Sequence, residues 1–336
     1  MTDLNIIYQE IQERLRKQLV VIVGTGSSMA VDYDFGMNSL ETHLKKEIPI
    51  QIKKNDKALT EWKKVSHNRK HGHDFENSLN GISSQFLLNR IISETGKYVA
   101  YINNKNLSKI NQGNIPIKSL FERLKQTFSY VNPSIDIITP NYDLIIENAL
   151  SQCNLDYNDG FFGGLQKGFD WSESEQQFIR IERENKTNKV YSRIKPHFKL
   201  HKVHGSLNYF VDNDFVVRND SLAYFDKPLN LERFIITPGD TKHKRIVENR
   251  QFYREMDSAI DKAQTYLFIG YGFNDLDIDK KICQNIKNSN RKAIIVTKDL
   301  TGNAPQIIID NPNIIAIADN NCGGSIISKH PIKPIL

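Results

Sequence analysis

A histidine followed by a glycine ends one apolar run of the sequence, in KVHGS at residues 202–206. Histidine titrates near neutrality, so His204 can accept a proton at cellular pH, and Gly205 lets a ligand approach the backbone closely. His204 is therefore a candidate general base, although a histidine in this position can also be a structural residue. His201 lies inside the same apolar run, and we expect it to be packed or paired within the fold.

An amide and a carboxylate, two residues apart, follow another apolar run in TPNYD at residues 139–143. Asn141 can hydrogen-bond to a substrate or orient a water molecule without changing its charge. The alternative is structural, because Asp143 precedes an apolar helical pattern and Asn141 suits a turn. The pair is thus a candidate for either chemistry or helix capping.

A glycine-containing turn, GTGSS at residues 24–28, follows the first apolar run. Gly24 and Gly26 permit a tight turn and the close approach of a phosphate, which a following helix N-terminus would favour. Ser27 and Ser28 add hydroxyl donors. The turn lacks the third glycine of the dinucleotide fingerprint and the lysine of a P-loop, so a plain strand-to-helix turn is the alternative.

A second such turn, GYGFND at residues 270–275, comes late in the chain. Its glycines again follow an apolar run, and Asn274 and Asp275 add polar groups directly after them. A turn followed by a helix cap would also explain these two side chains. The motif is informative only together with the others.

The elements that must position these groups are short apolar runs. LVVIV at residues 19–23 is too short for a helix and fully apolar, as a strand must be in a parallel sheet covered on both faces. The same pattern recurs at residues 135–139, 198–203, 265–270, 292–297 and 313–318. Helical patterns occur at residues 4–15, 117–128, 143–152 and 249–263.

Strands that alternate with helices predict an α/β fold, with an open, Rossmann-like, mostly parallel sheet and helices on both faces. In such a sheet, ligands bind beyond the carboxyl ends of the strands. The polar motifs are therefore expected on one rim, although they are far apart in the sequence. Phosphates, ribose hydroxyls and a base could meet there.

Two stretches are not expected to join this sheet, at approximately residues 40–118 and 154–197. The first contains a helix candidate at residues 74–93 and ends in a polar, turn-rich segment at residues 102–116. We expect both stretches to be insertions that form a smaller, mainly helical lobe or lid. Residues 1–336 are then a single domain.

Composition is that of a folded protein, with 39% hydrophobic and 25% charged residues. No secretion signal and no apolar run of membrane-spanning length is visible, so we expect a cytoplasmic location and no membrane partner. The net charge of +6 comes partly from residues 45–73, which predict either a solvated face or a nearby phosphate-rich partner. This charge does not demand non-specific nucleic-acid binding.

Metal ligands are not indicated. The cysteines stand singly, without a Cys-x-x-Cys pair, at Cys153, Cys283 and Cys322. A cysteine-type zinc site and a disulfide framework are therefore not expected. Three histidines lie close in sequence but lack the spacing of ligands on one fixed element, at His67, His71 and His73.

Taken together, these motifs resemble the sirtuin superfamily. The phosphate-binding Gly-Ala-Gly-x-Ser of that family corresponds to residues 24–28, its Thr-Gln-Asn-Ile/Tyr-Asp to residues 139–143, and its catalytic His-Gly to residues 204–205. Its late Gly-x-Ser/Gly turn resembles residues 270–272. The chain lacks the zinc-holding Cys-x-x-Cys pairs, and reads SMAVDYDFGMN at residues 28–38 where deacylating sirtuins carry Gly-Ile-Pro-Asp-Phe-Arg. Both departures weigh against protein deacylation.

The remaining pattern is similar to the zinc-free, sirtuin-like domains of bacterial anti-phage defence systems, which destroy NAD+ on infection. A Phe-Asn-Asp such as residues 273–275 is common in that branch, and so is an acidic helix such as residues 74–79, so that Asp74 or Glu76 would border the cleft. The resemblance implies NAD+ as the substrate and no zinc. The implied reaction is hydrolysis of the bond between nicotinamide and ribose.

The resemblance also implies roles for individual residues. Asn141 would position water and the ribose hydroxyls, His204 would act as the base, and Asp143 would orient neighbouring groups or favour positive charge. Thr297 would lie near the adenosine ribose. The implied NAD-binding residues are Gly24, Thr25, Gly26, Ser27, Ser28, Gly270, Gly272, Phe273, Asn274 and Thr297.

Two other functions fit the same residues. One is a deacylase or ADP-ribosyl transferase, which would use the same bond cleavage with another acceptor. The other is a non-catalytic subunit that binds NAD or ADP-ribose and regulates a partner. We expect a homo-oligomer, a separate sensor or ATPase partner protein, or both, with nucleic acid engaged only through such a partner.

Overall fold

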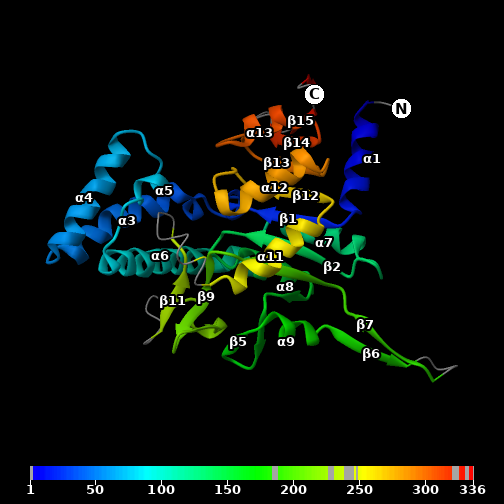
Figure 1. The fold of residues 1–336 in the computed structure, drawn as a ribbon, viewed down its shortest axis with the longest axis horizontal. Helices are drawn as coiled ribbons and strands as arrows, with labels where there is room; N and C mark the ends of the chain where they lie inside the picture. Colours follow the sequence, from blue (N-terminus) through cyan, green and yellow to red (C-terminus); the bar gives the residue numbers. More distant parts are fainter. Residues whose placement is uncertain are drawn as a thin grey trace.

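The computed structural model describes residues 3–183, 188–225, 231–237, 246, 249–319, 325–329 and 333–335. Its centre is a nine-stranded sheet with the strand order β16-β15-β14-β13-β12-β1-β2-β8-β3 (Figure 1). In chain order these strands are β1 (Leu19–Val23), β2 (Ser134–Thr139), β3 (Tyr157–Asn158), β8 (His197–Lys202), β12 (Thr265–Ile269), β13 (Lys292–Thr297), β14 (Ile314–Asp319), β15 (Ser325–Lys329) and β16 (Lys333–Ile335). All six apolar runs predicted as strands are strands of this sheet.

The seven strands from β14 to β3 are parallel, and β15 and β16 add an antiparallel edge. Numbered along the chain, β8-β2-β1-β12-β13-β14 have the order 3-2-1-4-5-6 of a doubly wound Rossmann sheet. The predicted Rossmann-like, mostly parallel sheet is confirmed. The order reverses between β1 and β12, which is where such sheets open a crevice for ligands.

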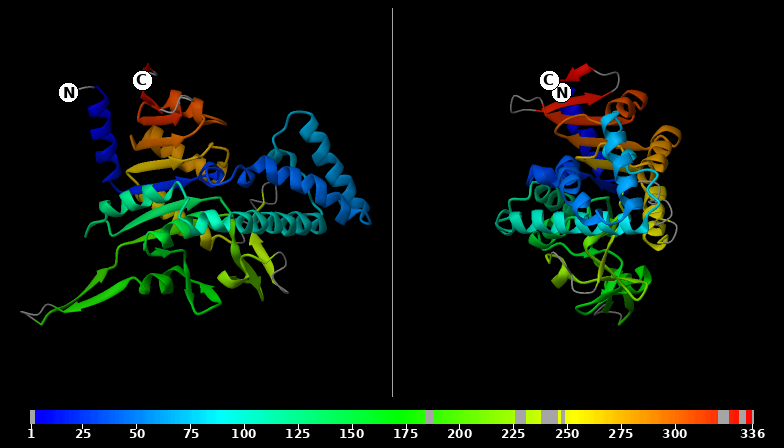
Figure 2. Two further views of the ribbon diagram at one scale, coloured as in Figure 1. Left: turned by 180° about the vertical axis from the view of Figure 1, so that it is seen from behind. Right: turned by 90° about the vertical axis from the view of Figure 1, so that its left-hand side faces the viewer.

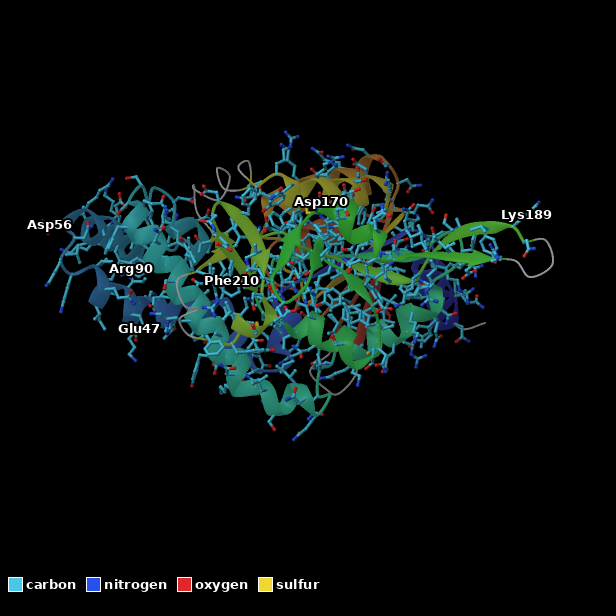
Figure 3. The ribbon with its side chains drawn as sticks, turned by 90° about the horizontal axis from the view of Figure 1, so that it is seen from below. Glu47, Asp56, Arg90, Asp170, Lys189 and Phe210 are labelled. Atoms are coloured by element: carbon cyan, nitrogen blue, oxygen red, sulfur yellow. The ribbon has the colours of Figure 1, made fainter. Side chains whose placement is uncertain are left out.

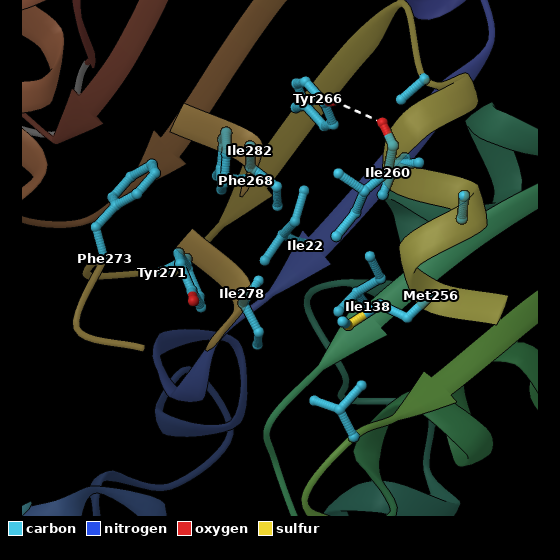
Figure 4. Close-up of a cluster of buried hydrophobic side chains, with 14 of the residues drawn as sticks. Ile22, Ile138, Met256, Ile260, Tyr266, Phe268, Tyr271, Phe273, Ile278 and Ile282 are labelled. Atoms are coloured by element: carbon cyan, nitrogen blue, oxygen red, sulfur yellow. Dashed lines mark hydrogen bonds between the residues drawn. The ribbon is translucent and has the colours of Figure 1, made fainter. Parts of the chain in front are cut away.

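Helices cover both faces of the sheet through two large apolar clusters. One face packs against α1 (Asp3–Leu15), α7 (Lys118–Leu124) and α8 (Ile145–Gln152). The other face packs against α11 (Gln251–Lys262), α12 (Leu276–Asn288) and α13 (Ala304–Asp310). Figure 4 shows part of the second cluster, in which Ile22 of β1 and Phe268 of β12 meet Ile260, Ile278 and Ile282 of the helices.

Residues 37–111 form a helical arm that extends to one side of the sheet (Figures 1 and 2). Its helices are α3 (Met37–Ile52), α4 (Asp56–Lys70), α5 (Phe75–Ser78) and α6 (Gln85–Asn111), and they enclose an apolar core of their own. The single helix expected at residues 74–93 is wrong, because α5 and α6 are separate.

The polar, turn-rich segment expected at residues 102–116 is also wrong, since α6 continues to Asn111. Asn103 and Asn106 are buried in this helix at 0% and 2% exposure. The side chain of Asn106 donates to Asp32 (3.0 Å) and to the backbone carbonyl of Ile102 (3.0 Å). Tertiary hydrogen bonds thus compensate for the low helix propensity of asparagine.

The stretch at residues 154–197 is mostly extended rather than helical. It contributes β3 to the main sheet, contrary to the expectation that it stays outside, and only α9 (Trp171–Gln176) is helical. A second, five-stranded sheet contains β4 (Phe161–Gly163), β5 (Lys167–Phe169), β9 (Gly205–Asp212), β10 (Phe215–Arg218) and β11 (Glu232–Ile235). A separate hairpin consists of β6 (Ile179–Arg183) and β7 (Val190–Ile194).

The two sheets meet at a sharp turn that contains His204. Strand β8 ends at Lys202, β9 begins at Gly205, and the N–H of Ile236 donates to the carbonyl of His204 (2.9 Å). Gly205 has φ +82, and a Cβ there would lie 1.9 Å from the carbonyl oxygen of Phe234. Only glycine fits this turn, which holds the backbone of His204 in place.

Candidate functional site

The two glycine turns interlock at the point where the strand order reverses. The N–H groups of Gly24 and Gly26 donate to the carbonyls of Ile269 (2.9 Å) and Gly270 (3.0 Å). A Cβ on Gly24 would lie 2.4 Å from the carbonyl oxygen of Gly270, and one on Gly26 would lie 2.8 Å from its Cα. Gly270 has φ +55 and the N–H of Ser27 nearby. The turns therefore fit together backbone to backbone.

Replacement of Gly24 by alanine is expected to destabilise the protein by about 1–3 kcal/mol, because the added methyl group meets rigid backbone atoms. The measurement is the free energy of unfolding from denaturant titration. Gly164→Ala is the matched control, since no atom lies within 4 Å of a Cβ at that position. Equal stability of the two variants would contradict the interlocked turns.

Asn141 is held against the first turn by a chain of hydrogen bonds. The Thr139 hydroxyl donates to the carbonyl of Val23 (2.8 Å) and accepts from the N–H of Asn141 (3.1 Å). The Asn141 amide group then donates to the carbonyl of Gly24 (3.1 Å) and to the Ser28 hydroxyl (3.2 Å). These contacts fix the side chain of Asn141. Its amide oxygen accepts from the Thr25 hydroxyl (3.4 Å) and can accept one more hydrogen bond.

Asp143, one residue before the N-cap Leu144, bonds to the start of α8 (Ile145–Gln152) and joins this chain. One carboxylate oxygen accepts from the N–H of Ile145 (3.0 Å), and the other accepts from the hydroxyl of Ser28 (2.7 Å). The carboxylate therefore has a structural role at the start of α8, and it also joins the hydrogen bonds around Asn141. Ser28 is fully buried with its hydroxyl donated to Asp143, and Ser27 donates its hydroxyl to the carbonyl of Gly24 (2.7 Å).

Lys202 and Glu147 form a buried ion pair next to the backbone of Asp143. Neither residue was predicted from the sequence as part of the site. The Lys202 ammonium group is buried, donates to the backbone carbonyl of Asp143, and pairs with Glu147 at 2.8 Å. Burial raises the pKa of Glu147, and the nearby Lys202 opposes this shift. The signal in the sequence is a charged residue inside each of two apolar patterns, KLHKV and LIIENAL.

His204 faces a carboxylate from the second glycine turn. Nε2 of His204 lies 3.1 Å from Oδ2 of Asp275, close enough for an ion pair when the ring is protonated, although not in hydrogen-bond geometry. Asp275 also caps α12, since its side chain accepts from the N–H of Asp277 (3.2 Å). Sequence reasoning placed Asp275 in a turn and cap but missed that it faces the histidine.

Phe273 and Asn274 complete the second turn. Phe273 is buried with φ +56, a strained conformation for an aromatic residue, and it packs against Phe268 with ring centroids 4.5 Å apart. Asn274 is exposed. The amide group of Asn274 lies close to Gly272 and to Gly302. A Cβ added at Gly302 would lie 2.8 Å from the amide oxygen of Asn274.

A cavity of about 380 Å³ opens beside the first turn, within the range of ligand pockets. Four residues implied as NAD-binding line it, namely Gly26, Ser27, Gly270 and Thr297. The rest of the lining is mostly apolar and comes from α1, α7 and strands β12–β14. On α2 (Thr25–Met29), Thr25 and Ser28 contact the Asn141 group, whereas Gly26 and Ser27 line the cavity.

The other candidates lie apart from this constellation. Asp74 is exposed and its carboxylate accepts from the N–H of Asn77 (2.7 Å), and the side chain of Glu76 lies outside the described residues. His201 pairs with Asp136 (2.8 Å), as expected of a structural histidine.

Clusters of metal ligands and membrane-spanning helices are both absent from the described part of the chain. No group of three or more potential metal ligands occurs there. Cys153 and Cys283 are free, whereas Cys322 lies outside the described residues. No described helix has the length and apolar character needed to cross a membrane.

The reversed strand order and the glycine turn at the reversal define a Rossmann-like α/β protein. The family model of the SIR2-like domain matches residues 136–308, which is more than half of the chain. The chain therefore belongs to the SIR2-like family, and its function is NAD-related. The match includes Asn141, His204 and the second glycine turn but not the first. A comparison with curated proteins gives no match.

Proposed function

We propose that the protein hydrolyses NAD+ at the nicotinamide–ribose bond and releases nicotinamide and ADP-ribose. One observation carries the proposal: Asn141 and His204 leave neighbouring parallel strands at the same level. The register pairs Thr139 with Lys202, and each of the two side chains follows its strand residue by two positions. The amide of Asn141 also bonds to Gly24 of the first glycine turn, and the ring of His204 faces Asp275 of the second.

The reaction needs a held ribose, stabilisation of positive charge and a positioned water molecule. The C1′–N bond breaks with its electron pair passing to the nicotinamide nitrogen, so nicotinamide leaves as a neutral molecule. The oxygen of water bonds to the oxocarbenium-like C1′, and the proton that it loses passes to His204. Asp275, 3.1 Å from the ring, then stabilises the protonated imidazole.

Asn141 orients the water in this scheme. Its amide hydrogens are donated to the carbonyl of Gly24 and to Ser28, which leaves its oxygen to accept from water or a ribose hydroxyl. Asp143 holds Ser28 in place through the 2.7 Å hydrogen bond. The carboxylate also favours positive charge nearby, as the oxocarbenium ion requires.

The cavity beside the first turn would hold the adenosine half of the dinucleotide, with Thr297 near the ribose. Because the N–H groups of Gly24, Gly26 and Ser27 are donated within the protein, the pyrophosphate would lie along the cavity lining of Gly26, Ser27 and Gly270 rather than on these donors. Gly272, Phe273 and Asn274 would border the same ligand from the second turn.

The test is to follow NAD+ products from the purified chain in water enriched in ¹⁸O, with and without an acyl-lysine peptide. Hydrolysis gives nicotinamide together with ADP-ribose labelled at C1′. Release that requires the peptide would instead indicate a deacylase, and a modified protein would indicate an ADP-ribosyl transferase. NAD+ binding without any product would support a regulatory subunit.

Asn141→Asp is expected to lower the turnover number on the order of 10- to 100-fold, because a carboxylate oxygen would then face the carbonyl of Gly24 without a hydrogen to donate. The measurement is the rate of nicotinamide release at saturating NAD+. Asn89→Asp is the matched control, since Asn89 is exposed and its oxygen only accepts from Gln85. An unchanged rate in Asn141→Asp would exclude this role.

We further propose that the chain is an NAD-depleting effector of anti-phage defence, acting in the cytoplasm. The support is the resemblance of residues 24–28, 139–143, 204–205 and 273–275 to that zinc-free branch. Such an effector must be silent until it is triggered, so self-assembly or a separate sensor or ATPase partner would control it. Activity that rises steeply with protein concentration would support control by assembly.

A further inference from the structure

The hairpin β6–β7 extends away from the two larger sheets, with Lys189 near its far end (Figures 1 and 3). It forms a two-stranded sheet of its own, and all but one of the ten residues in its two strands are exposed. A two-stranded ribbon in water is marginally stable by itself. The hairpin therefore lacks the layer that normally stabilises such a ribbon.

The two faces of the hairpin differ in character. Because side chains alternate along a strand, the pairs Ile179–Ile194, Ile181–Ser192 and Arg183–Val190 lie on one face. The pairs Arg180–Arg193 and Glu182–Tyr191 lie on the other face. The first face is apolar, with Ile179, Ile181, Val190 and Ile194 exposed by 43%, 79%, 59% and 49%.

Arg193, on the charged face, contacts the rest of the chain. The guanidinium group of Arg193 lies 5.5 Å from the centre of the Tyr130 ring, and it is 3.7 Å from Glu182 on the same face. The apolar face is consequently turned away from this contact. A hairpin that served only its own subunit would bury the isoleucines and expose the arginines.

We infer that the apolar face of this hairpin packs against the same face of a second copy of the chain. Such a contact is isologous, so each hairpin uses the same residues. Both isoleucine faces are buried together, while the like-charged pair Arg180–Arg193 stays on the outside. A nucleic acid would be attracted by the arginines but would leave the isoleucines in water, so a protein surface is favoured.

Charge along the hairpin fits two copies that run in opposite directions. The far end carries Arg183 and Lys189, whereas helix α9, which precedes β6, carries Glu173 and is capped by Asp170. A two-fold axis through the middle of the hairpin places the basic end of one copy at the acidic base of the other. A face of three residue pairs is expected to bury less than the roughly 800 Å² per partner of a stable dimer, so dimerisation is expected to depend on concentration.

Cross-linking through introduced cysteines tests the geometry directly in the full-length chain. Ser192 belongs to the middle pair of the apolar face, next to the expected two-fold axis, whereas Arg193 is its neighbour on the opposite face. With a bis-maleimide cross-linker that spans about 10 Å, the usual distance between two packed sheets, Ser192→Cys should give a covalent dimer, and Arg193→Cys should give no more than the unsubstituted chain. Equal trapping of both variants, or none in either, would overturn the inference.

Sedimentation over a range of concentrations tests the energetics. Ile181→Asp should weaken dimerisation at least about tenfold, since the substitution removes two isoleucines from one symmetric contact. Ile50→Asp is the control, because Ile50 is comparably exposed, at 58%, on α3. Arg183→Glu should also weaken the dimer, and Glu173→Arg in the same chain should restore it.

These variants lie on exposed positions, so folding is checked by circular dichroism and thermal unfolding. A chain that is monomeric at every concentration would overturn the inference, as would a dimer that Ile181→Asp leaves unchanged. Binding of duplex DNA that requires Arg180 and Arg193, without dimerisation, would point to a nucleic acid and likewise overturn it. None of these readouts depends on NAD+ turnover, so the inference and the proposed function can fail separately.

Discussion

His204→Ala should reduce nicotinamide release from NAD+ by about 10²- to 10⁴-fold, the contribution typical of a positioned general base. The side chain stands at the turn between the two sheets, where Gly205 and the hydrogen bond from Ile236 fix its backbone. Without the imidazole, the water that attacks C1′ has no acceptor for its proton. The measurement is single-turnover nicotinamide release, together with NAD+ affinity from calorimetry.

Affinity should change little in His204→Ala, because the cavity beside the first glycine turn does not include this residue. His71→Ala is the control, since His71 is exposed on the helical arm. Asp275→Asn separates positioning from proton transfer: it keeps the shape of the side chain but removes the charge 3.1 Å from the ring. Its rate should fall between those of the unsubstituted chain and His204→Ala.

Two outcomes would contradict this assignment. If His204→Ala retained the full rate, the base would be another group, and the proposed mechanism would fail. If the variant lost NAD+ binding as completely as turnover, His204 would contribute to binding rather than to the chemical step. Both comparisons require that the unsubstituted protein is active. Because activity could depend on self-assembly, the assay should be repeated at several protein concentrations.

The central sheet could be predicted because its strands are short and mostly apolar. A strand such as LVVIV, in which every residue is apolar, must be buried on both faces of its sheet. Strands of this kind that alternate with helices predict a parallel sheet. The expectation that the polar motifs lie on one rim followed from the rule that ligands bind beyond the carboxyl ends of parallel strands. The observed order of strands, which places β12 beside β1, explains why residues as distant as Gly24 and Gly270 are in contact.

Other features depend on partners that are remote in the sequence. Asp275 has the sequence signature of a helix cap, and only the packing of α12 against β1 and β12 turns it toward His204. The second sheet was missed because β9 follows β8 after two residues, so one apolar pattern continues through both. The helix α6 depends on Asn106 bonding to Asp32, a contact that propensity cannot indicate.

Lys202→Met should destabilise the protein by about 3–5 kcal/mol, the usual effect of removing one partner from a buried ion pair. The side chains of Lys202 and Glu147 are exposed by only 1% and 9%, with 2.8 Å between the charged groups. Methionine has a similar length but cannot neutralise the carboxylate. The measurement is the free energy of unfolding from denaturant titration at several pH values.

The pH dependence of Lys202→Met has a definite sign. Burial already raises the pKa of Glu147 above its ordinary value of 4.5, and the loss of Lys202 removes the main opposing effect. The folded variant then holds a proton that the unfolded chain releases once the pH exceeds that ordinary value. Stability of the variant should therefore fall as the pH rises above about 4.5, more steeply than in the unsubstituted chain.

A second substitution separates stability from positioning. Lys202→Met with Glu147→Leu removes both charges, and replacing a buried ion pair by apolar residues is often neutral or stabilising. The double variant should regain most of the lost stability and lose the pH dependence. Its rate of nicotinamide release should stay low, because the hydrogen bond from Lys202 to the backbone carbonyl of Asp143 is still missing. Recovery of both stability and rate would show that Lys202 serves the fold alone.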